Sequence, residues 1–279
     1  MAGVDPIDHD LDCGGREGRR PHPSFDGEWY VLRNPDVQKA GMNPLIRYSR
    51  YGGREGRRAH KSVVVYTAIL GNYDELRSPL VVDPDLDYMA FVDDWITEVP
   101  APWVRIPYSD DPRGPRLTAK FIKTHPHLLC PQYEVSVWID GAFRIRDVRS
   151  DSVNALLDGQ DMALFPHPER DCAYDEAEVV RQRGLDSPDA IDRMVGILKS
   201  RSYPRRAGLL AAGLMIRRHN EPHVVNAMEE WWRLISTGSV RDQLSLNFVI
   251  WQLGLSYKEL PGVLWANELA EWTSHRSGR

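Results

Sequence analysis

The sequence predicts an α/β domain over residues 61–279, preceded by a small region of short helical repeats over residues 1–60. Two observations lead to this fold class. After residue 60, apolar β-branched runs that end in polar residues alternate with segments of helix length, which is the pattern of an α/β domain. Before residue 60, one segment of the sequence occurs twice, which is typical of a repeated structural unit.

The amino-acid composition limits the kinds of partner that this protein can bind. The 279 residues carry a net charge of -5, and charges of both signs are mixed along the chain, which argues against a nucleic-acid or membrane-surface protein. The three cysteines have no metal or redox spacing and suit a reducing compartment. No apolar run approaches the ~20 residues that span a bilayer. We expect a cytoplasmic protein without a transmembrane segment, with a small-molecule or protein partner and no nucleic acid.

The internal repeat lies in the first sixty residues. The segment AGVDPIDHDLDCGGREGRRPH at 2–22 recurs as AGMNPLIRYSRYGGREGRRAH at 40–60. Asp26, Asn34 and Asn43, the last two followed by proline, are predicted to cap short helices. Each GGREGRR run is interpreted as a charged turn rather than an anion site. We expect protein partners to bind through this region.

The α/β part begins with an apolar strand and continues with alternating elements. The segment at 100–115 is predicted to be a loop, and 266–279 a polar tail. Strands are predicted at 63–70, 87–94, 135–139, 161–165, 208–220 and 257–260, and helices at 116–131, 152–157, 175–183, 187–201, 223–236 and 240–253.

Polar side chains follow several of these strands. Asp140 and Gly141 end the strand at 135–139, and Asp93 and Asp94 end the strand at 87–94. Ligands of open α/β sheets sit outside the carboxyl ends of the strands, so an Asp followed by Gly at that edge is placed for a polar ligand or a metal. An ordinary Asp-Gly turn is the alternative, and these two residues alone favour it.

Two further groups of polar residues are candidates for the same ligand site. His167, Glu169 and Arg170 follow the strand at 161–165, which is either a ligand edge or a loop with a local ion pair. Lys120 and Lys123 are three residues apart on a predicted helix and therefore share one face.

Six blocks in one colinear order, covering roughly residues 62–262, carry a family resemblance. The blocks are VVVYTAILGNYDEL, YMAFVDD, LTAKFIKTHPH, SVWIDGAFRI, LFPHPER with YDEA, and RDQLSLNFVIWQLG. They resemble the plant mucilage-related glycosyltransferase-like family, formerly a domain of unknown function, whose bacterial members occur beside polysaccharide-synthesis genes. The segments FDGEWYVLRNPDV and NPLIRYSRYGGREGR resemble short repeats found next to bacterial glycosyltransferases.

The resemblance implies a GT-A-like, Rossmann-like fold with a mixed sheet flanked by helices. It also implies transfer of a sugar from a nucleotide-sugar donor to a glycan or other hydroxyl acceptor, in polysaccharide or surface-glycan synthesis. Asn72 and Tyr73, in the loop after the first strand, are candidates to contact the nucleotide, with a simple turn as the alternative.

Breaking the bond from the sugar to the diphosphate puts negative charge on the leaving group, which a divalent metal or fixed cations can stabilise. GT-A enzymes commonly hold Mn²⁺ or Mg²⁺ with an Asp-x-Asp. Asp140 keeps the first carboxylate of that motif, and Ala142 stands where the second would be. Either Asp93 or Asp94 supplies the missing metal ligand, or Lys120, Lys123 and Arg170 neutralise the diphosphate without a metal.

An inverting transfer also needs a base close to the acceptor hydroxyl. Asp242, at the start of a late helix, fits by position, with a helix cap as the alternative. His167 and Glu169 are the second candidates. Stereochemistry is left open by the sequence.

Two other functions compete with a glycosyltransferase. The first is a non-catalytic glycan- or protein-binding subunit that kept the fold after losing the second acid. The second is a hydrolase in which Asp140, His125, His127 and His167 bind a metal that activates water. Because His125 and His127 are two residues apart and face different sides, the hydrolase ranks last.

Overall fold

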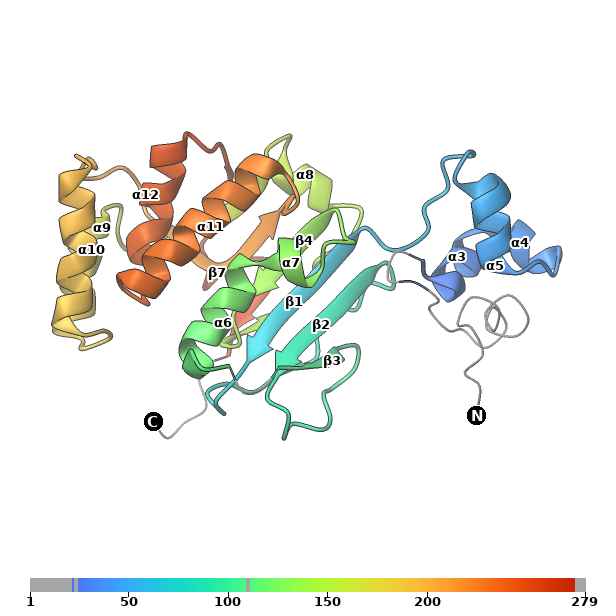
Figure 1. Ribbon diagram of the computed structural model, residues 1–279, viewed down its shortest axis with the longest axis horizontal. Helices are drawn as coiled ribbons and strands as arrows, with labels where there is room; N and C mark the ends of the chain where they lie inside the picture. The colour runs from blue at the N-terminus through green and yellow to red at the C-terminus, as the bar shows by residue number, and fades with distance from the viewer. Residues whose placement is uncertain (1–21, 23–24, 109–110, 274–279) are drawn as a thin grey trace. The chain divides into compact units, whose positions relative to one another are not determined.

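The computed structural model describes residues 22, 25–108 and 111–273 (Figure 1). The chain divides into two compact units, Met1–Ser62 and Val63–Arg279. Except for His22, the first copy of the repeat, residues 2–22, lies outside the described residues. None of the described helices is long and apolar enough to cross a membrane.

The smaller unit contains short helices around an aromatic cluster. Phe25, Tyr30 and Tyr48 form the cluster, with ring centroids 5.6 Å apart in each pair. Gly52 lies so close to the Tyr30 hydroxyl that any side chain at position 52 would displace it. The helical elements of this unit are α3 (Gly27–Arg33), α4 (Pro35–Lys39), α5 (Pro44–Arg47) and the π-helical turn η2 (Tyr48–Gly52).

The three predicted caps in this unit lie at helix N-cap positions, and two of them make a side-chain cap bond. The Asp26 carboxylate accepts from Trp29 N at 2.9 Å, and Asn43 Oδ1 accepts from Leu45 N at 2.9 Å. Asn34 also lies at the N-cap position of α4, with Pro35 in the first turn, but its side chain makes no cap bond and instead accepts from Arg57 at 3.1 Å.

The charges of the second GGREGRR run pair within the unit. Arg57 contacts Asp36 at 2.8 Å, and Arg47 contacts Glu55 at 3.0 Å. These pairs hold the pKa of Asp36 and of Glu55 below their ordinary values, with the arginine hydrogen bonds as the largest cause. The run is therefore part of an ion-pair network within the unit.

The larger unit is built on a seven-stranded sheet with the order β3-β2-β1-β4-β7-β6-β8. Strand β7 is antiparallel to both of its neighbours, β4 and β6. The other neighbouring pairs of this sheet are parallel. The strands are β1 (Val63–Ile69), β2 (Leu86–Val92), β3 (Val104–Pro107), β4 (Val135–Ile139), β6 (Met162–Pro166), β7 (Leu210–Arg217) and β8 (Lys258–Glu259).

Helices cover the sheet and complete the predicted architecture. Alternate residues of β4 enter different apolar clusters: Trp138 packs with residues of α6, α11 and α12, while Val137 and Ile139 pack on the opposite face. The predicted fold class is confirmed as a mixed α/β sheet flanked by helices. The helices are α6 (Gly114–Thr124), α7 (Pro126–Leu129), α8 (Val153–Leu157), α9 (Ala173–Gln182), α10 (Pro188–Ser200), α11 (Pro222–Thr237) and α12 (Gln243–Leu253).

Three predictions about elements are wrong. The segment 100–115, predicted to be a loop, contains the edge strand β3. The helix predicted at 116–131 ends at Thr124 and restarts as α7, because Pro126 cannot donate the next helical hydrogen bond. Within the predicted tail, β9 (Ala270–Trp272) pairs with β5 (Phe143–Ile145) in a separate two-stranded sheet.

Candidate functional site

Asp140 lies at the carboxyl end of β4, in the middle of the sheet. Its backbone N–H donates to Gly213 O on β7 at 2.8 Å, which fixes the end of the strand. Its carboxylate oxygen Oδ1 accepts from Trp138 Nε1 at 2.7 Å and lies 3.2 Å from Lys123 Nζ. Trp138 and Asp140 are two residues apart and therefore point to the same face of the sheet. About a third of the Asp140 side chain, 35%, is exposed.

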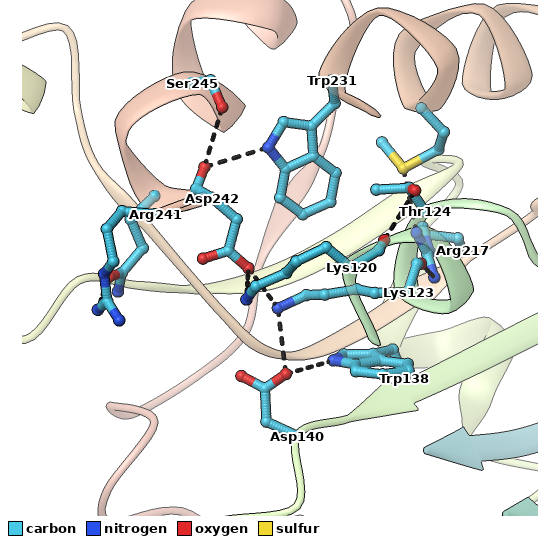
Figure 2. Close-up of polar contacts among 12 residues, drawn as sticks. Lys120, Lys123, Thr124, Trp138, Asp140, Arg217, Trp231, Arg241, Asp242 and Ser245 are labelled. Atoms are coloured by element: carbon cyan, nitrogen blue, oxygen red, sulfur yellow. Dashed lines mark hydrogen bonds and ion pairs between the residues drawn. The ribbon is translucent and has the colours of Figure 1, made fainter. Parts of the chain in front are cut away.

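Lys120 and Lys123 reach this edge from α6, which packs on β1. Side chains of a helix tilt toward its N-terminus, so a lysine near the end of α6 extends back along the helix toward the carboxyl edge of the parallel strands. Lys123 is 1% exposed and Lys120 is 21% exposed. Figure 2 shows both side chains converging on Asp242.

Asp242 precedes α12 and faces both lysines. Its Oδ2 lies 2.7 Å from Lys120 Nζ and 2.7 Å from Lys123 Nζ. Its backbone carbonyl accepts from Trp231 Nε1 at 3.1 Å, and its side chain makes no capping hydrogen bond to the helix (Figure 2). The alternative from the sequence, in which the Asp242 side chain only caps the helix, is therefore wrong. Lysine and aspartate thus alternate in a buried cluster of Lys120, Lys123, Asp140 and Asp242, called here the charge cluster.

The ionisation of the charge cluster follows from burial and pairing. Burial favours the neutral form of Asp242, but the two lysines outweigh it and hold the pKa of its carboxyl far below the ordinary value. Burial also lowers the pKa of Lys120, where it outweighs the attraction of Asp242. For Lys123, burial is outweighed by Asp140 and Asp242, so the pKa of its ammonium is raised. Lys123 is therefore the more firmly protonated lysine.

A buried arginine fixes the C-terminal end of α6, next to the charge cluster. Arg217, on β7, is fully buried, and its guanidinium donates to Lys123 O at 2.9 Å and to the Tyr66 hydroxyl. Tyr66 in turn donates to Lys123 O at 2.8 Å. The Lys123 carbonyl therefore accepts from two donors. These contacts fix the position of the Lys123 backbone, from which the side chain extends toward Asp140.

Asp93 and Asp94 do not join Asp140 as a carboxylate pair. Asp93 Oδ2 accepts from Gly71 N at 2.7 Å and so fixes the loop after β1. The Asp94 side chain is exposed, and its backbone carbonyl accepts from Arg105 at 2.8 Å. Strand β1 separates β2 from β4, which puts two strand spacings, about 10 Å, between the ends of these strands.

The loop after β1 holds the two predicted nucleotide contacts. Asn72 is exposed with a positive φ of 56°, and Tyr73 is 58% exposed. The next residue, Asp74, lies against Gly141: a methyl group at position 141 would lie 2.8 Å from Asp74 Oδ2 and 2.7 Å from Ile69 Cδ1. Sequence reasoning missed Asp74, although it belongs to the same GNYD loop.

Gly141→Ala should therefore destabilise the fold by about 2 kcal/mol, since the added methyl group overpacks against Ile69 and Asp74. Chemical denaturation measures the change. Gly196→Ala is the matched control, because no atom lies within 4 Å of an added methyl group in α10, and it should stabilise the protein by roughly 0.5 kcal/mol. Equal effects of the two substitutions would contradict the close approach at Gly141.

His167, Glu169 and Arg170 form a second group after β6. Arg170 contacts Glu176 at 2.5 Å and Glu169 at 2.8 Å, so its charge is already paired. His167 Nδ1 accepts from Arg170 N at 3.1 Å, and burial lowers the pKa of the imidazole. Because β7 lies between β6 and β4, this group follows a strand two spacings, about 10 Å, from β4. The sequence allowed either a ligand edge or a loop with a local ion pair at this point, and the structure shows the local ion pair.

The metal prediction can be tested on the chemistry of these side chains. In the part of the chain that the structure describes, no three or more His, Cys, Asp or Glu side chains form a group that could hold a metal ion. Asp140 Oδ1 is engaged by Trp138 and Lys123, and Asp93 by Gly71. His125 and His127 instead approach Glu229, at 3.5 and 3.0 Å. The described residues therefore do not fit the metal site proposed from Asp140, Asp93 and Asp94, nor that of the hydrolase.

Of the predicted site residues, the structure brings together Lys120, Lys123, Asp140 and Asp242. The residues that sequence reasoning missed are those that hold them. Trp138 could have been found from the strand pattern, because it precedes Asp140 by two residues. Arg217, Tyr66 and Trp231 gave no such signal, since their roles depend on contacts between segments distant in the sequence.

No protein-family model and no curated protein matches the chain. Among solved structures, it is similar to one described as the WbbM bifunctional glycosyltransferase, with 10% identity, a TM-score of 0.40, and coverage of 72% of this chain and 38% of that chain. It is also similar to mouse xyloside xylosyltransferase 1, with 9% identity, a TM-score of 0.39, and coverage of 74% and 85%. At these scores the likeness adds no argument about activity, which rests on the residues of the site.

Proposed function

We propose that the protein is a glycosyltransferase that moves a sugar from a nucleotide-diphosphate donor to a glycan or other hydroxyl acceptor in polysaccharide or surface-glycan synthesis. The observation that carries the proposal is the charge cluster at the carboxyl end of β4, where two lysines of one helix meet two aspartates at 2.7 to 3.2 Å. Ligands of open α/β sheets bind at this edge.

The two lysines have different tasks in this proposal. Lys123 is buried between Asp140 and Asp242 and holds the two acids in place. Lys120 has one acidic partner and is 21% exposed, so its ammonium can turn to the donor diphosphate. When the bond from the anomeric carbon to the diphosphate oxygen breaks, its electron pair stays on the diphosphate, and Lys120 stabilises the added charge. No metal ion is needed for this role.

In this proposal Asp140 receives the donor sugar. Trp138 and Lys123 engage its Oδ1, and among the described residues no donor contacts Oδ2. A carboxylate oxygen in this position accepts hydrogen bonds from sugar hydroxyls. The loop of Asn72 and Tyr73, which follows the adjacent strand β1, contacts the nucleotide in this proposal.

The acceptor oxygen forms the new bond to the anomeric carbon, and its proton passes to a base. Asp242 is a weak base, since Lys120 and Lys123 hold its pKa far below the ordinary value. Its role in the proposal is to position the two lysines. His167 and Glu169 stay predictions for the base.

One observation favours the second candidate function, a non-catalytic glycan- or protein-binding subunit. Asp242 is held by both lysines, and the lowered pKa of its carboxyl makes it a weak base. Such a subunit would retain affinity for a glycan or a protein and show no turnover of any nucleotide sugar. Hydrolysis and transfer assays with a set of nucleotide sugars separate the two functions.

Lys120→Ala tests the proposal through donor binding. A nucleoside diphosphate should raise the melting temperature of the wild-type protein, without a requirement for manganese. In the variant, the affinity obtained from this shift should fall about tenfold, because one charge-assisted hydrogen bond to the diphosphate is lost.

Lys199→Ala is the matched control for that substitution. Lys199 is an exposed residue near the end of α10 and should leave the affinity unchanged. A wild-type protein whose melting temperature responds to none of the common nucleoside diphosphates would rule out the glycosyltransferase.

A further inference from the structure

The two-stranded sheet that follows Asp140 carries an aromatic surface of Phe143, Trp265 and Trp272. The ring centroid of Phe143 lies 5.6 Å from that of Trp265 and 5.1 Å from that of Trp272, and the two tryptophans are 4.9 Å apart. Trp265 is 46% exposed and Trp272 is 42% exposed, whereas Phe143 beneath them is 8% exposed. The two indoles therefore cover the phenylalanine and present their own outer surfaces to solvent.

The orientation of Trp265 leaves a flat surface accessible. Its ring is stacked on Phe143 with an interplanar angle of 18°, while Trp272 meets it edge to face at 87°. Phe143 covers one face of the Trp265 ring, and 46% of the Trp265 side chain is still exposed. An exposed indole face is a suitable surface for a flat, partly apolar ligand.

The aromatic surface is tied to both loops of the candidate site. Phe143 comes three residues after Asp140, and its ring packs on Gly213, whose carbonyl accepts from Asp140 N. At the same end of the sheet, next to the Phe143–Trp272 pair, Thr273 N donates to Ala142 O at 3.0 Å. Arg77, from the segment after the β1 loop, donates to Thr273 Oγ1 at 2.5 Å. The aromatic surface is therefore joined to Asp140 through Gly213 and through the turn in which Phe143 N donates to Asp140 O.

The opposite face of the same sheet is charged. Arg144 and Glu271 occupy the register positions next to Phe143 and Trp272, and their side chains approach to 3.9 Å. Successive side chains of a strand point to opposite faces, so aromatic and charged residues are separated. The aromatic character thus belongs to the face that carries the buried Ile145 and Ala270, and the two tryptophans form its solvent-facing end.

We propose that Trp265 and Trp272 form the acceptor subsite and bind a pyranose ring of the acceptor glycan by stacking. One face of a pyranose ring presents C–H groups, and its rim presents hydroxyls, which matches an indole that offers an apolar face bordered by solvent. This inference rests on the proposed function, because an acceptor sugar must lie beside the sugar of the donor. It names the acceptor as a glycan in preference to another hydroxyl compound.

Glycan binding by the full chain tests this proposal, with a printed array of pyranose glycans as the probe and titration of the glycans that bind. Trp265→Ala and Trp272→Ala should each weaken binding about tenfold. Trp265→Phe should restore most of the affinity, which separates stacking from a loss of folding. Trp251→Ala is the matched control, since Trp251 is 45% exposed and also contacts two aromatic rings, and it should leave binding unchanged.

The proposal is overturned if the wild-type protein binds no arrayed glycan, or if Trp251→Ala weakens binding as much as Trp265→Ala. Self-association that Trp265→Ala abolishes would assign the surface to a second copy of the chain and would also overturn it. The nucleoside diphosphate shift is measured on the same samples. If that shift persists while glycan binding fails, the acceptor subsite is wrong and the glycosyltransferase proposal stands.

Discussion

Asp242→Asn should destabilise the protein by about 3 kcal/mol, because it leaves two lysines in a buried cluster with one carboxylate between them. The substitution keeps the size of the side chain and removes its charge. Lys123 then has only Asp140, at 3.2 Å, and Lys120 loses its closest acid. Chemical denaturation at neutral pH measures the change.

Asp189→Asn is the matched control. Asp189 lies in the first turn of α10 and is exposed, so only its interaction with the helix dipole is lost, about 0.5 kcal/mol. A loss for Asp242→Asn as small as that of the control would show that the charge cluster does not stabilise the fold.

The stabilising effect of Asp242 should depend on pH in one direction. The folded protein holds the pKa of this carboxyl below its unfolded value of about 4, so the folded state favours the ionised form. Its contribution is therefore complete above that pH and is lost as the pH falls toward the folded pKa. The difference in unfolding free energy between the wild-type protein and Asp242→Asn should shrink below about pH 4.

The same variant separates two roles for Asp242 in transfer. If Asp242 positions the lysines, Asp242→Asn weakens nucleoside diphosphate binding, increasingly so as the pH rises, because the pKa of the unpaired lysines falls. If Asp242 is the base, as the sequence suggested, donor binding is retained and the rate of the transfer step is lost. Thermal shift with a nucleoside diphosphate, measured from about neutral pH upward toward the ordinary lysine pKa of about 10.4, distinguishes the outcomes.

Asp140→Asn should reduce sugar transfer about 100-fold and cost less stability than Asp242→Asn, because Lys123 keeps its closer partner Asp242 at 2.7 Å. The charge of Asp140 acts at the edge of the sheet, where 35% of the side chain is exposed, so its loss affects the bound donor more than the fold. The asparagine oxygen can still accept from Trp138 Nε1, which preserves the local geometry. Steady-state rates, measured with a nucleotide sugar that the wild-type protein turns over, give the loss of transfer. The melting temperature gives the change in stability.

Asp147→Asn provides the control for this substitution. Asp147 lies in the same segment, is 48% exposed and pairs with Arg149 on the surface, so its loss should leave transfer unchanged. An Asp140→Asn variant with wild-type activity would remove Asp140 from the site and with it the proposed contact to the donor sugar.

Part of the candidate site could be predicted from the sequence because it depends on local pattern. Alternation along residues 135–139 places Asp140 at the end of a buried strand, and the three-residue spacing of Lys120 and Lys123 places both on one helix face. Neither pattern indicates which acid meets which lysine. The suggested partners of Asp140 were Asp93 and Asp94, whereas its carboxylate contacts Lys123 and Trp138.

By itself, the sequence determined the α/β class and Asp140 at the end of a central strand. Tertiary structure alone decided that α12 brings Asp242 against α6, that Arg217 anchors Lys123, and that β9 brings Trp272 beside β5. The physical reason is that periodicity reports which face of an element is buried. Pairing between charges 119 residues apart depends on how the elements pack, which no local pattern specifies.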